Sequence, residues 1–433
     1  MQDLPESQRV AVIGSGIGGL TAAWLLRRRH PVTLFEQHAR PGMGVFGIDY
    51  SSGGRTTRID VPTRVFCEGY YPHLFALLST LGVQVHATDH AAAFADGRGE
   101  IFFHYGNFRL LGHSVSYLRR DGRRQPLKLL RIVRDSLRFF PAARRDLARD
   151  AAGLSRMTFG EYLDARGYSA AFTHGVLLPT LSVICTCDCE SVRAYPADLI
   201  LGYLASGVMK QGVMRAELGV DAIVERLVDG VTPVSGAAVS RISRASGGGF
   251  EVHTQDGAVR PFDRVVLATQ AHQAAQMLGD AFPQTALLHR IPFEHSVMRV
   301  HTDASVLPRA ANGALSPVTY HLPEGAPRPE VTVDMTQAFS TYSGQARVFQ
   351  TWNPLRAVRE GSVLLEVGFT RPRVTHDSRE ASAELRRLQS QEAGLLFCGA
   401  YMADRVPLLE AAVESAVEVA ERLGVRAPWS APA

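Results

Sequence analysis

The stretch Val10-Ala-Val-Ile-Gly-Ser-Gly-Ile-Gly-Gly-Leu20 decides the fold of this chain. Its first four residues are apolar and mostly β-branched, which is typical of a buried strand. Gly14, Gly16 and Gly19 follow in the G-x-G-x-x-G spacing. Gly14 permits a tight turn, Gly16 lets the backbone approach a pyrophosphate, and Gly19 lets a helix pack close to the strand. The stretch therefore predicts a dinucleotide-binding turn.

The next residues complete a β-α-β unit. Residues 20–29 continue as a helix with arginines in its last turn, where cations suit the helix dipole. Pro31 ends this helix, and the apolar run 32–35 predicts a second strand. Glu36 follows, 17 residues after Gly19, at the position that accepts hydrogen bonds from a ribose. The helix N-terminus offers N–H groups and partial positive charge to the pyrophosphate.

The bulk composition limits the class of protein. A chain of 433 residues suits two or three domains, and 46% hydrophobic residues can bury a sizeable core. The sequence contains no run of about 18 apolar residues, so no membrane-spanning helix is expected. The polar N-terminus does not resemble a signal peptide. Five cysteines, an odd number, indicate reduced thiols in the cytoplasm. The net charge of +4 is small, and no nucleic-acid partner is expected.

A family resemblance begins after the second strand. Glu36, Arg40 and Gly42 match the pattern Glu-x3-Arg-x-Gly-Gly-Arg of the flavin amine oxidase and phytoene desaturase superfamily of FAD enzymes. Met43 and Gly44 replace the second glycine and the closing arginine. The resemblance implies an α/β fold with a Rossmann-like FAD-binding domain and a discontinuous α+β substrate domain. It also implies that Arg40 helps to hold the FAD phosphates.

Two further segments carry the resemblance. Residues 60–83, with Tyr71-Pro-His-Leu, are similar to the Asp…Tyr-Pro-Asn-Leu…Leu-Gly-Val segment of a bacterial subgroup of predicted NAD/FAD-binding proteins. Residues 394–401 resemble the strand from which the superfamily continues into a helix that closes over the flavin. Glu410 and Ser415 match the subgroup's helix, whereas alanines replace its Asp-Gly pair and its last glycine. The N-terminus of such a helix stabilises an anionic reduced flavin.

The resemblance covers nearly the whole chain and implies five segments. The FAD-binding domain is expected to comprise residues 1–75, 215–285 and 386–433. The helical part of the substrate domain is expected at 76–214, and its mixed or antiparallel sheet at 286–385. This sheet is predicted from five strand-like stretches at 296–300, 318–321, 331–335, 347–351 and 362–367.

The same patterns name the residues expected at the site. The cofactor-binding residues are expected to be Gly14, Gly16, Ile17, Gly18, Gly19, Glu36, Gln37, Arg40, Gly42, Val239, Ala268, Gly399, Ala400, Glu410, Ala412 and Val413. The catalytic candidates are His301, Tyr320, His321 and Tyr401, and no catalytic base is identified. Cys185, Cys187 and Cys189 alternate as in an extended segment but lack the C-x2-C spacing of zinc sites. They are expected near a substrate cavity, and no metal site is expected.

Residues 119–150 form a basic segment, with eleven arginine and lysine residues against four aspartates. Lys128, Arg131, Arg134 and Arg138 recur at helical spacing, which is typical of a basic amphipathic helix. The opposite face carries Leu127, Leu130, Val133, Leu137 and Phe140. Two interpretations stand: the solvated face of a packed helix, or a surface that docks on an acidic carrier protein or an anionic membrane.

The expected reaction follows from the cofactor. FAD chemistry favours hydride abstraction from an apolar, lipid-like or carrier-bound metabolite by a dehydrogenase, desaturase or oxidase. Many amine oxidases of the superfamily hold a lysine near the flavin, but the corresponding segment around 297–301 has none. The only lysines, Lys128 and Lys210, are far from it in sequence. Amine oxidation, redox-neutral double-bond isomerisation, as in some fatty-acid isomerases on this scaffold, and a non-enzymatic flavoprotein are the alternatives. The sequence does not predict the oligomeric state.

Overall fold

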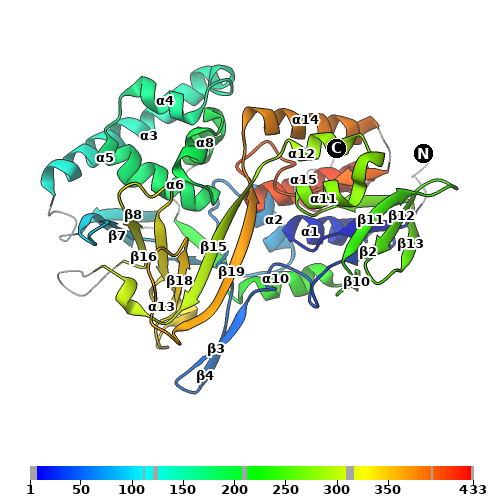
Figure 1. Cartoon of the computed structure of the whole chain (residues 1–433), viewed down its shortest axis with the longest axis horizontal. Coiled ribbons are helices and arrows are strands. Elements are labelled where there is room, and N and C mark those ends of the chain that lie inside the picture. The colour runs from blue at the N-terminus through cyan, green and yellow to red at the C-terminus, as the bar shows by residue number, and fades with distance from the viewer. Residues whose placement is uncertain are drawn as a thin grey trace.

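The computed structural model describes residues 7–110, 113–119, 125–206, 212–308, 316–391 and 394–430. Two halves lie side by side in Figure 1. The right half is built on a five-stranded parallel sheet and holds both termini, and the left half is built on an eight-stranded sheet covered by helices. The long strands β15 (Phe293–His301) and β19 (Val363–Pro372) run between the two halves.

The parallel sheet has the strand order of a Rossmann-like fold, β10-β2-β1-β14-β20, and neighbouring strands are parallel. Its strands are β1 (Val10–Ile13), β2 (Val32–Phe35), β10 (Thr232–Val234), β14 (Arg264–Leu267) and β20 (Leu395–Phe397). The predicted strands at 10–13 and 32–35 and the predicted α/β fold class are confirmed. Three distant parts of the chain therefore meet in one sheet.

Side-chain alternation along β1 separates two hydrophobic clusters. Val10 and Val12 pack toward α1 (Ile17–Leu26), α10 (Gly219–Val228) and α15 (Leu409–Arg422). Ala11 and Ile13 pack on the other side, toward α11 (Ala271–Leu278) and the three-stranded sheet β11 (Val239–Arg244), β12 (Phe250–Thr254) and β13 (Val259–Phe262). Because both faces are covered, the sheet is rigid enough to fix the loops at its carboxyl ends.

The eight-stranded sheet has the order β19-β15-β18-β17-β16-β6-β7-β8. Its shorter strands are β6 (Ala92–Asp96), β7 (Ile101–Leu110), β8 (His113–Leu118), β16 (Val318–Leu322), β17 (Glu330–Asp334) and β18 (Phe349–Trp352). The five predicted strand stretches correspond to β15 to β19. Residues 92–118 were expected in a helical part, yet they add three strands to this sheet. β16 pairs with β6 in parallel, so the sheet is mixed.

Two small antiparallel strand pairs and further helices complete the described part of the chain. The pairs are β3 (Ile48–Ser52) with β4 (Arg55–Ile59), and β5 (Val85–Thr88) with β9 (Val213–Ala216). The helices are α2 (Pro72–Thr80), α3 (Pro126–Leu154), α4 (Phe159–Arg166), α5 (Ala170–Phe172), α6 (Leu178–Cys185), α7 (Cys189–Arg193), α8 (Ala197–Ala205), α12 (Gln284–His289), α13 (Met335–Ala338) and α14 (His376–Gln391). A capping box formed by Thr158 and Glu161 starts α4.

The cysteine-rich segment is not extended, which corrects the expectation from its alternating pattern. Cys185 ends α6, Thr186 has a left-handed backbone with φ of 55°, and Cys189 begins α7. Two short helices joined by a tight turn therefore replace the expected extended chain. Burial raises the pKa of the Cys189 thiol to about 11, and all five cysteines are free.

The basic segment forms the predicted helix, α3, but a different stripe of it is buried. The buried side chains are Ile132, Asp135, Phe139, Ala142, Ala143 and Leu154. Leu127, Leu130 and Leu137 are instead 73%, 64% and 73% exposed, on a helix that also carries the basic residues. Residues 120–124 of the segment lie outside the described residues. Docking of this face on an acidic carrier protein or an anionic membrane stays a prediction.

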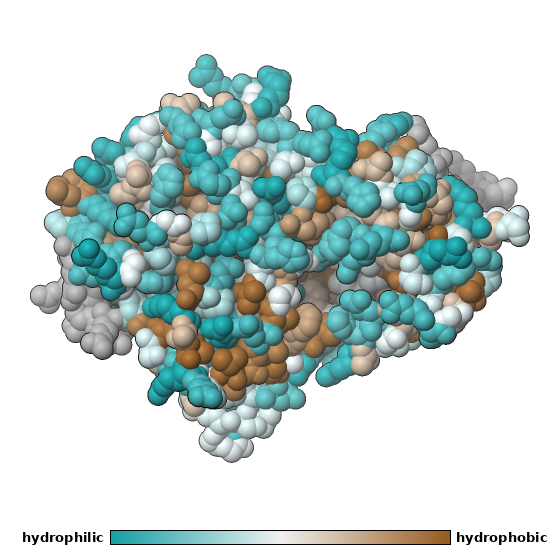
Figure 2. Space-filling view, viewed as in Figure 1, coloured by the Kyte–Doolittle hydropathy of each residue, from teal (hydrophilic) through white to brown (hydrophobic). Residues whose placement is uncertain are grey.

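Other exposed apolar side chains gather on the sheet. Figure 2 shows apolar residues in the lower part of the face of the molecule that is turned to the viewer, over β15, β18 and β19. The large exposed apolar residues of these strands and the loop after β18 are Val297, Leu355, Val363 and Leu364.

None of the helices in the described ranges combines the length and the apolar composition that a membrane span requires.

Candidate functional site

A cavity of about 670 Å³ lies at the carboxyl ends of the parallel strands. This is the crevice in which open α/β sheets bind their ligands. Twelve of the residues expected at the cofactor line it: Gly14, Gly16, Ile17, Gly18, Glu36, Gln37, Gly42, Val239, Ala268, Gly399, Ala400 and Ala412. Residues from the first strand, from β11 and from the C-terminal region are thus brought to one place.

The glycine turn has the geometry that its spacing predicts. Gly14 has φ of +99°, a backbone conformation that residues other than glycine rarely adopt. A Cβ on Gly19 would lie 2.0 Å from the carbonyl oxygen of Gly14, so α1 packs directly on the turn. A Cβ on Gly16 would meet nothing within 4 Å, because this residue faces the open cavity. The backbone at Gly16 is therefore accessible to a ligand.

Glu36 holds the turn and borders the cavity. Its side chain accepts hydrogen bonds from Ser15, through the backbone N–H at 3.2 Å and the hydroxyl, and from the backbone N–H of His38 at 2.8 Å. The Ser15 hydroxyl oxygen accepts a hydrogen bond from the N–H of Gly42 at 2.7 Å. Each carboxylate oxygen has two lone pairs, so Glu36 keeps acceptor capacity for a ribose hydroxyl.

The C-terminal region closes the opposite side of the cavity. A Cβ on Gly18 would lie 3.0 Å from the sulfur of Cys398 and 3.1 Å from the carbonyl oxygen of Ala412, which brings α1 close to α15. The Ser415 hydroxyl oxygen accepts a hydrogen bond from the N–H of Gly399 at 2.9 Å. Leu408 is the N-cap of α15 and its side chain makes no capping hydrogen bond. Leu408, Leu409 and Ala412 line the cavity. Free N–H groups of this turn can therefore serve a ligand.

Four of the expected cofactor residues do not line the cavity. Gly19 and Val413 are packed behind its wall. Arg40 is exposed. Glu410 is fully buried and turned toward α2, where it accepts hydrogen bonds from the N–H groups of His73 and Leu74 at 3.0 and 2.9 Å. Glu410 therefore caps α2 and joins it to α15.

Two polar groups in the wall lack a partner. The hydroxyls of Thr269 and Tyr401 are buried, line the cavity and make no hydrogen bond with the described residues. Buried polar atoms are normally satisfied, so these hydroxyls fit a polar ligand. The cavity wall thus offers the open turn at Gly16, the Glu36 carboxylate, the first turn of α15 and these two hydroxyls. FAD has polar groups that this set of residues can bind.

A second cavity, of about 320 Å³, lies beside the first. Strands β16 to β18, helices α6 and α8, and the β7–β8 pair all contribute to its wall. Its apolar and aromatic residues include Phe66, Val183, Ile184, Tyr203, Val318, Tyr320, Val331, Phe339 and Trp352. Arg64, Arg371, Leu408 and Leu409 line both cavities. The two cavities therefore adjoin, and both volumes fall in the range of small-molecule sites.

The ionisable groups of the second cavity are mostly neutral at pH 7. Burial lowers the pKa of His90 to about 4, and raises that of the Cys67 thiol to about 11 and that of Tyr105 to about 12. No aspartate, glutamate or lysine occurs among the described residues that line it. Arg64 and Arg371 are thus the charged groups of this wall.

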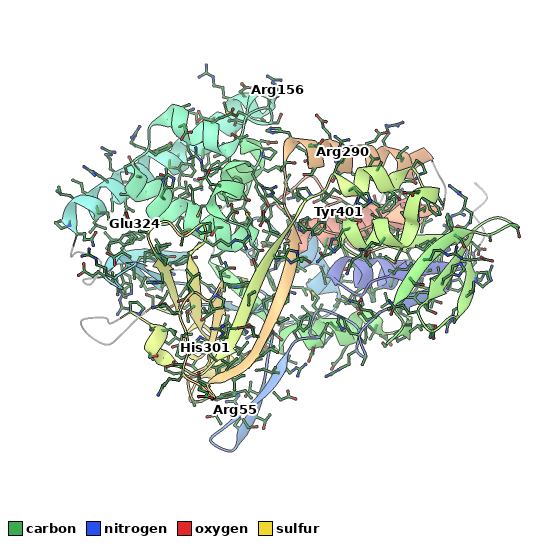
Figure 3. All side chains as sticks on the ribbon, viewed as in Figure 1. Arg55, Arg156, Arg290, His301, Glu324 and Tyr401 are labelled. Atoms are coloured by element: carbon green, nitrogen blue, oxygen red, sulfur yellow. The ribbon has the colours of Figure 1, made fainter. Side chains whose placement is uncertain are left out.

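The four catalytic candidates lie in different places. Tyr401 lines the first cavity, and Tyr320 lines the second, stacked on Phe94 with 4.4 Å between the ring centroids. His321 lines neither cavity, because it neighbours Tyr320 on β16 and points to the other face. His301 also lies outside both cavities, and its Nε2 is 2.8 Å from the hydroxyl of Thr351. Figure 3 shows His301 well separated from Tyr401.

Sequence reasoning missed Arg64 and Arg371. Arg64 lies in the segment recognised by its resemblance, and Arg371 at the end of β19. Of the 46 basic residues, 44 are arginines, so arginine content gave no means of selecting these two. Their shared feature is spatial, since both border the two cavities.

Comparisons with known proteins agree with this architecture. Residues 12–81 match the family described as NAD(P)-binding Rossmann-like domain. The sequence comparison with curated proteins finds no significant match. A putative protoporphyrinogen oxidase from Exiguobacterium sp. 255-15 has a similar structure, with a TM-score of 0.65 and 17% identity over 96% of this chain and 98% of the other.

Two further solved structures are similar over nearly their whole length. A CLA-producing fatty acid isomerase from P. acnes gives a TM-score of 0.70 at 15% identity, over 97% of this chain and 99% of the other. Cyclohexylamine oxidase from Brevibacterium oxydans IH-35A gives 0.61 at 15% identity, over 97% and 100%. At 15–17% identity these likenesses show the fold alone, and the α/β fold expected from the family resemblance is confirmed.

Proposed function

We propose that this protein is an FAD-dependent oxidoreductase that abstracts a hydride from a C–H bond of an apolar metabolite. FAD would occupy the first cavity and the substrate the second. The observation that carries the proposal is the contact between the two cavities at Arg64, Arg371, Leu408 and Leu409. A substrate in the second cavity would thereby lie next to a cofactor in the first.

The residues present would divide the work of such an enzyme. Gly16 and Glu36 would hold the dinucleotide part, and the first turn of α15 would direct its N–H groups at the electron-rich end of the ring. FAD, when bound, accepts a hydride from a C–H bond. The apolar wall of the second cavity would exclude water and orient the carbon chain. Tyr320 and Tyr401 are the catalytic candidates that line a cavity.

A second candidate is redox-neutral isomerisation of a double bond. The likeness to the fatty acid isomerase, at a TM-score of 0.70, favours it. Amine oxidation has less support: none of the lysines in the described ranges lines either cavity, and two arginines at their junction would repel a cationic amine.

The test is an anaerobic titration of the purified yellow protein. Compounds with apolar chains are added, and flavin absorbance and product are followed together. Loss of flavin absorbance with formation of an oxidised product supports the oxidoreductase. A shifted double bond without lasting flavin reduction supports the isomerase. A flavin that no compound reduces or turns over, across fatty acids, alcohols, amines and hydrocarbons, would contradict both.

A further inference from the structure

Arg64 and Arg371 occupy the junction of the two cavities without a partner of opposite charge in contact. Neither guanidinium makes a hydrogen bond or an ion pair with any residue in the described ranges. The Nε of Arg64 is buried and unsatisfied. Both side chains are half-buried, and both border the two cavities. Donors of this kind are costly to leave unpaired.

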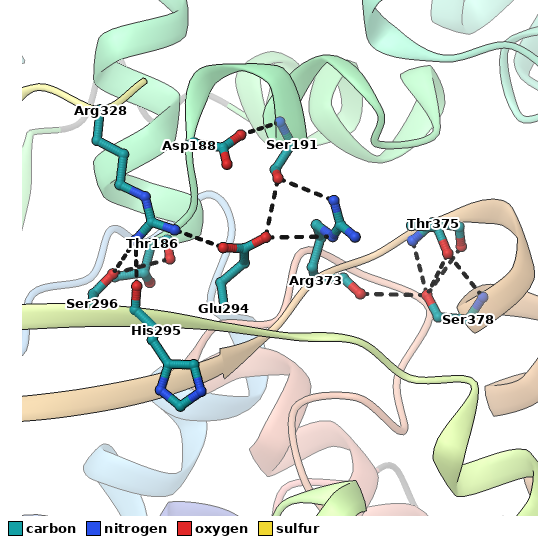
Figure 4. Close-up of polar contacts among 10 residues, drawn as sticks. All are labelled: Thr186, Asp188, Ser191, Glu294, His295, Ser296, Arg328, Arg373, Thr375 and Ser378. Carbon is teal, nitrogen blue, oxygen red and sulfur yellow. Dashed lines mark hydrogen bonds and ion pairs between the residues drawn. The ribbon is translucent and has the colours of Figure 1, made fainter. Parts of the chain in front are cut away.

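The nearest acids are already engaged. Asp60 is 2.8 Å from Arg215 in a fully buried ion pair. Glu294 lies directly opposite Arg371 in the pairing of β15 with β19, yet its carboxylate is engaged by Arg328 at 2.6 Å and Arg373 at 3.7 Å (Figure 4). The chain thus pairs neighbouring arginines with acids and leaves these two unpaired.

The electrostatic consequence is a positive, partly desolvated spot. Burial first, and then repulsion by Arg371, lowers the pKa of Arg64 to about 9. Burial also lowers the pKa of Arg371. No described residue of the second cavity's wall supplies a negative charge. An anion that enters this cavity would be attracted to one place, and the apolar remainder would accept its hydrocarbon part.

We propose that Arg64 and Arg371 bind the carboxylate of a substrate whose remaining part is apolar, and so fix the carbon chain beside the cofactor. This inference rests on the proposed function, because it assigns the second cavity to the substrate. Arginine forks match the two oxygens of a carboxylate in plane. A carboxylate also balances the charge better than an amine, alcohol or hydrocarbon head group, because only the carboxylate is negative.

The test compares four ligands that share one chain: dodecanoate, dodecyl phosphate, dodecanol and dodecylamine. Their binding to the FAD-loaded protein is measured by isothermal titration calorimetry, and the bound flavin is quantified for every variant. The variants are Arg64→Met, Arg371→Met and Arg371→Lys. Arg55→Met is the matched control, because Arg55 is an exposed arginine of the β3–β4 pair, far from Tyr401 in Figure 3.

Dodecanoate is expected to bind the wild-type protein roughly 10- to 100-fold more tightly than dodecanol, as expected for a hydrogen-bonded charged group. Arg64→Met and Arg371→Met should each reduce that preference at least about tenfold while dodecanol binding changes little. Arg371→Lys should restore part of it, and Arg55→Met should leave it unchanged.

The inference would be overturned by equal affinity for dodecanoate and dodecanol, by no binding of dodecanoate, or by loss of FAD instead of carboxylate preference in the methionine variants. The last result would assign the arginines to the cofactor. Tighter binding of dodecyl phosphate than of dodecanoate would also contradict the assignment of a carboxylate as the bound group. Charge-selective binding without flavin turnover would refute the proposed function alone, and turnover of neutral chains only would refute this inference alone.

Discussion

Replacing Arg215 with methionine should strongly destabilise the protein. Arg215 lies on β9 and is 2% exposed. Its guanidinium donates to Asp60 at 2.8 Å and to the hydroxyl of Tyr342 at 3.2 Å. It also lies over the rings of Phe339 and Tyr342, at 4.9 and 5.4 Å from their centroids. The Asp60 carboxylate additionally accepts from the N–H of Val220 at the start of α10. One side chain thus joins three segments that are far apart in the sequence, at residues 60, 215 and 342.

The magnitude follows from what the substitution leaves behind. Arg215→Met leaves Asp60 buried without its counter-ion, and removing one partner of a buried pair costs about 3–5 kcal/mol. Burial already raises the pKa of Asp60, with Arg215 as the main opposing influence. The double variant Asp60→Asn with Arg215→Met carries no unpaired charge of this pair. It should therefore lose less stability than the sum of the two single variants, by at least about 1.5 kcal/mol.

The assay is urea unfolding of the FAD-saturated protein at pH 7, followed by circular dichroism and tryptophan fluorescence. Saturation matters because a bound ligand contributes to apparent stability. Arg55→Met serves as the exposed control and should change stability by less than about 0.5 kcal/mol. A loss below about 1 kcal/mol for Arg215→Met, or strict additivity in the double variant, would refute the reasoning.

Three further substitutions test other parts of the structure. Gly19→Ala would place a Cβ 2.0 Å from the carbonyl oxygen of Gly14 and should abolish FAD retention. Its control is Gly202→Ala in α8, where a Cβ meets nothing within 4 Å, and this variant should be neutral or more stable. Equal flavin content in the two variants would contradict the turn geometry. Glu410→Gln should lower the free energy of unfolding by about 1–2 kcal/mol, because the charge that caps α2 is lost, and an unchanged urea midpoint would count against that cap. Because the folded pKa of His90, about 4, is below the unfolded value near 6.5, only the unfolded chain is protonated between them. Stability should therefore fall by up to about 3 kcal/mol from pH 6.5 to 4, and a pH-insensitive difference between the wild-type protein and His90→Gln would refute this.

Local sequence patterns predicted the parts of the fold that local physics determines. The strand at 10–13, the glycine turn and the strand at 32–35 are contiguous, so each residue type could be assigned its structural role. The helix between them begins at Ile17, three residues before its predicted start, because Gly16 is already its N-cap. The five strands from 293 to 372 were also visible, since alternation marks half-buried strands.

Features that depend on tertiary packing were not predictable in this way. The alternating cysteines are spaced as in a strand, but in the folded chain Cys185 ends α6 and Cys189 begins α7. The exposed leucines of α3 gave the same pattern as buried ones, because periodicity does not say which face is covered. Arg64 and Arg371 are 307 residues apart, and only the folded chain brings both to the same junction.

The flavin content of the purified protein tests the central claim most directly. The claim is that the N-terminal glycine turn and the first turn of α15 together enclose one FAD. The protein is incubated with excess FAD, freed of unbound cofactor by gel filtration and denatured, and the released flavin is quantified. The account predicts one FAD per chain. Protein that stays colourless and releases no flavin after this treatment would contradict it.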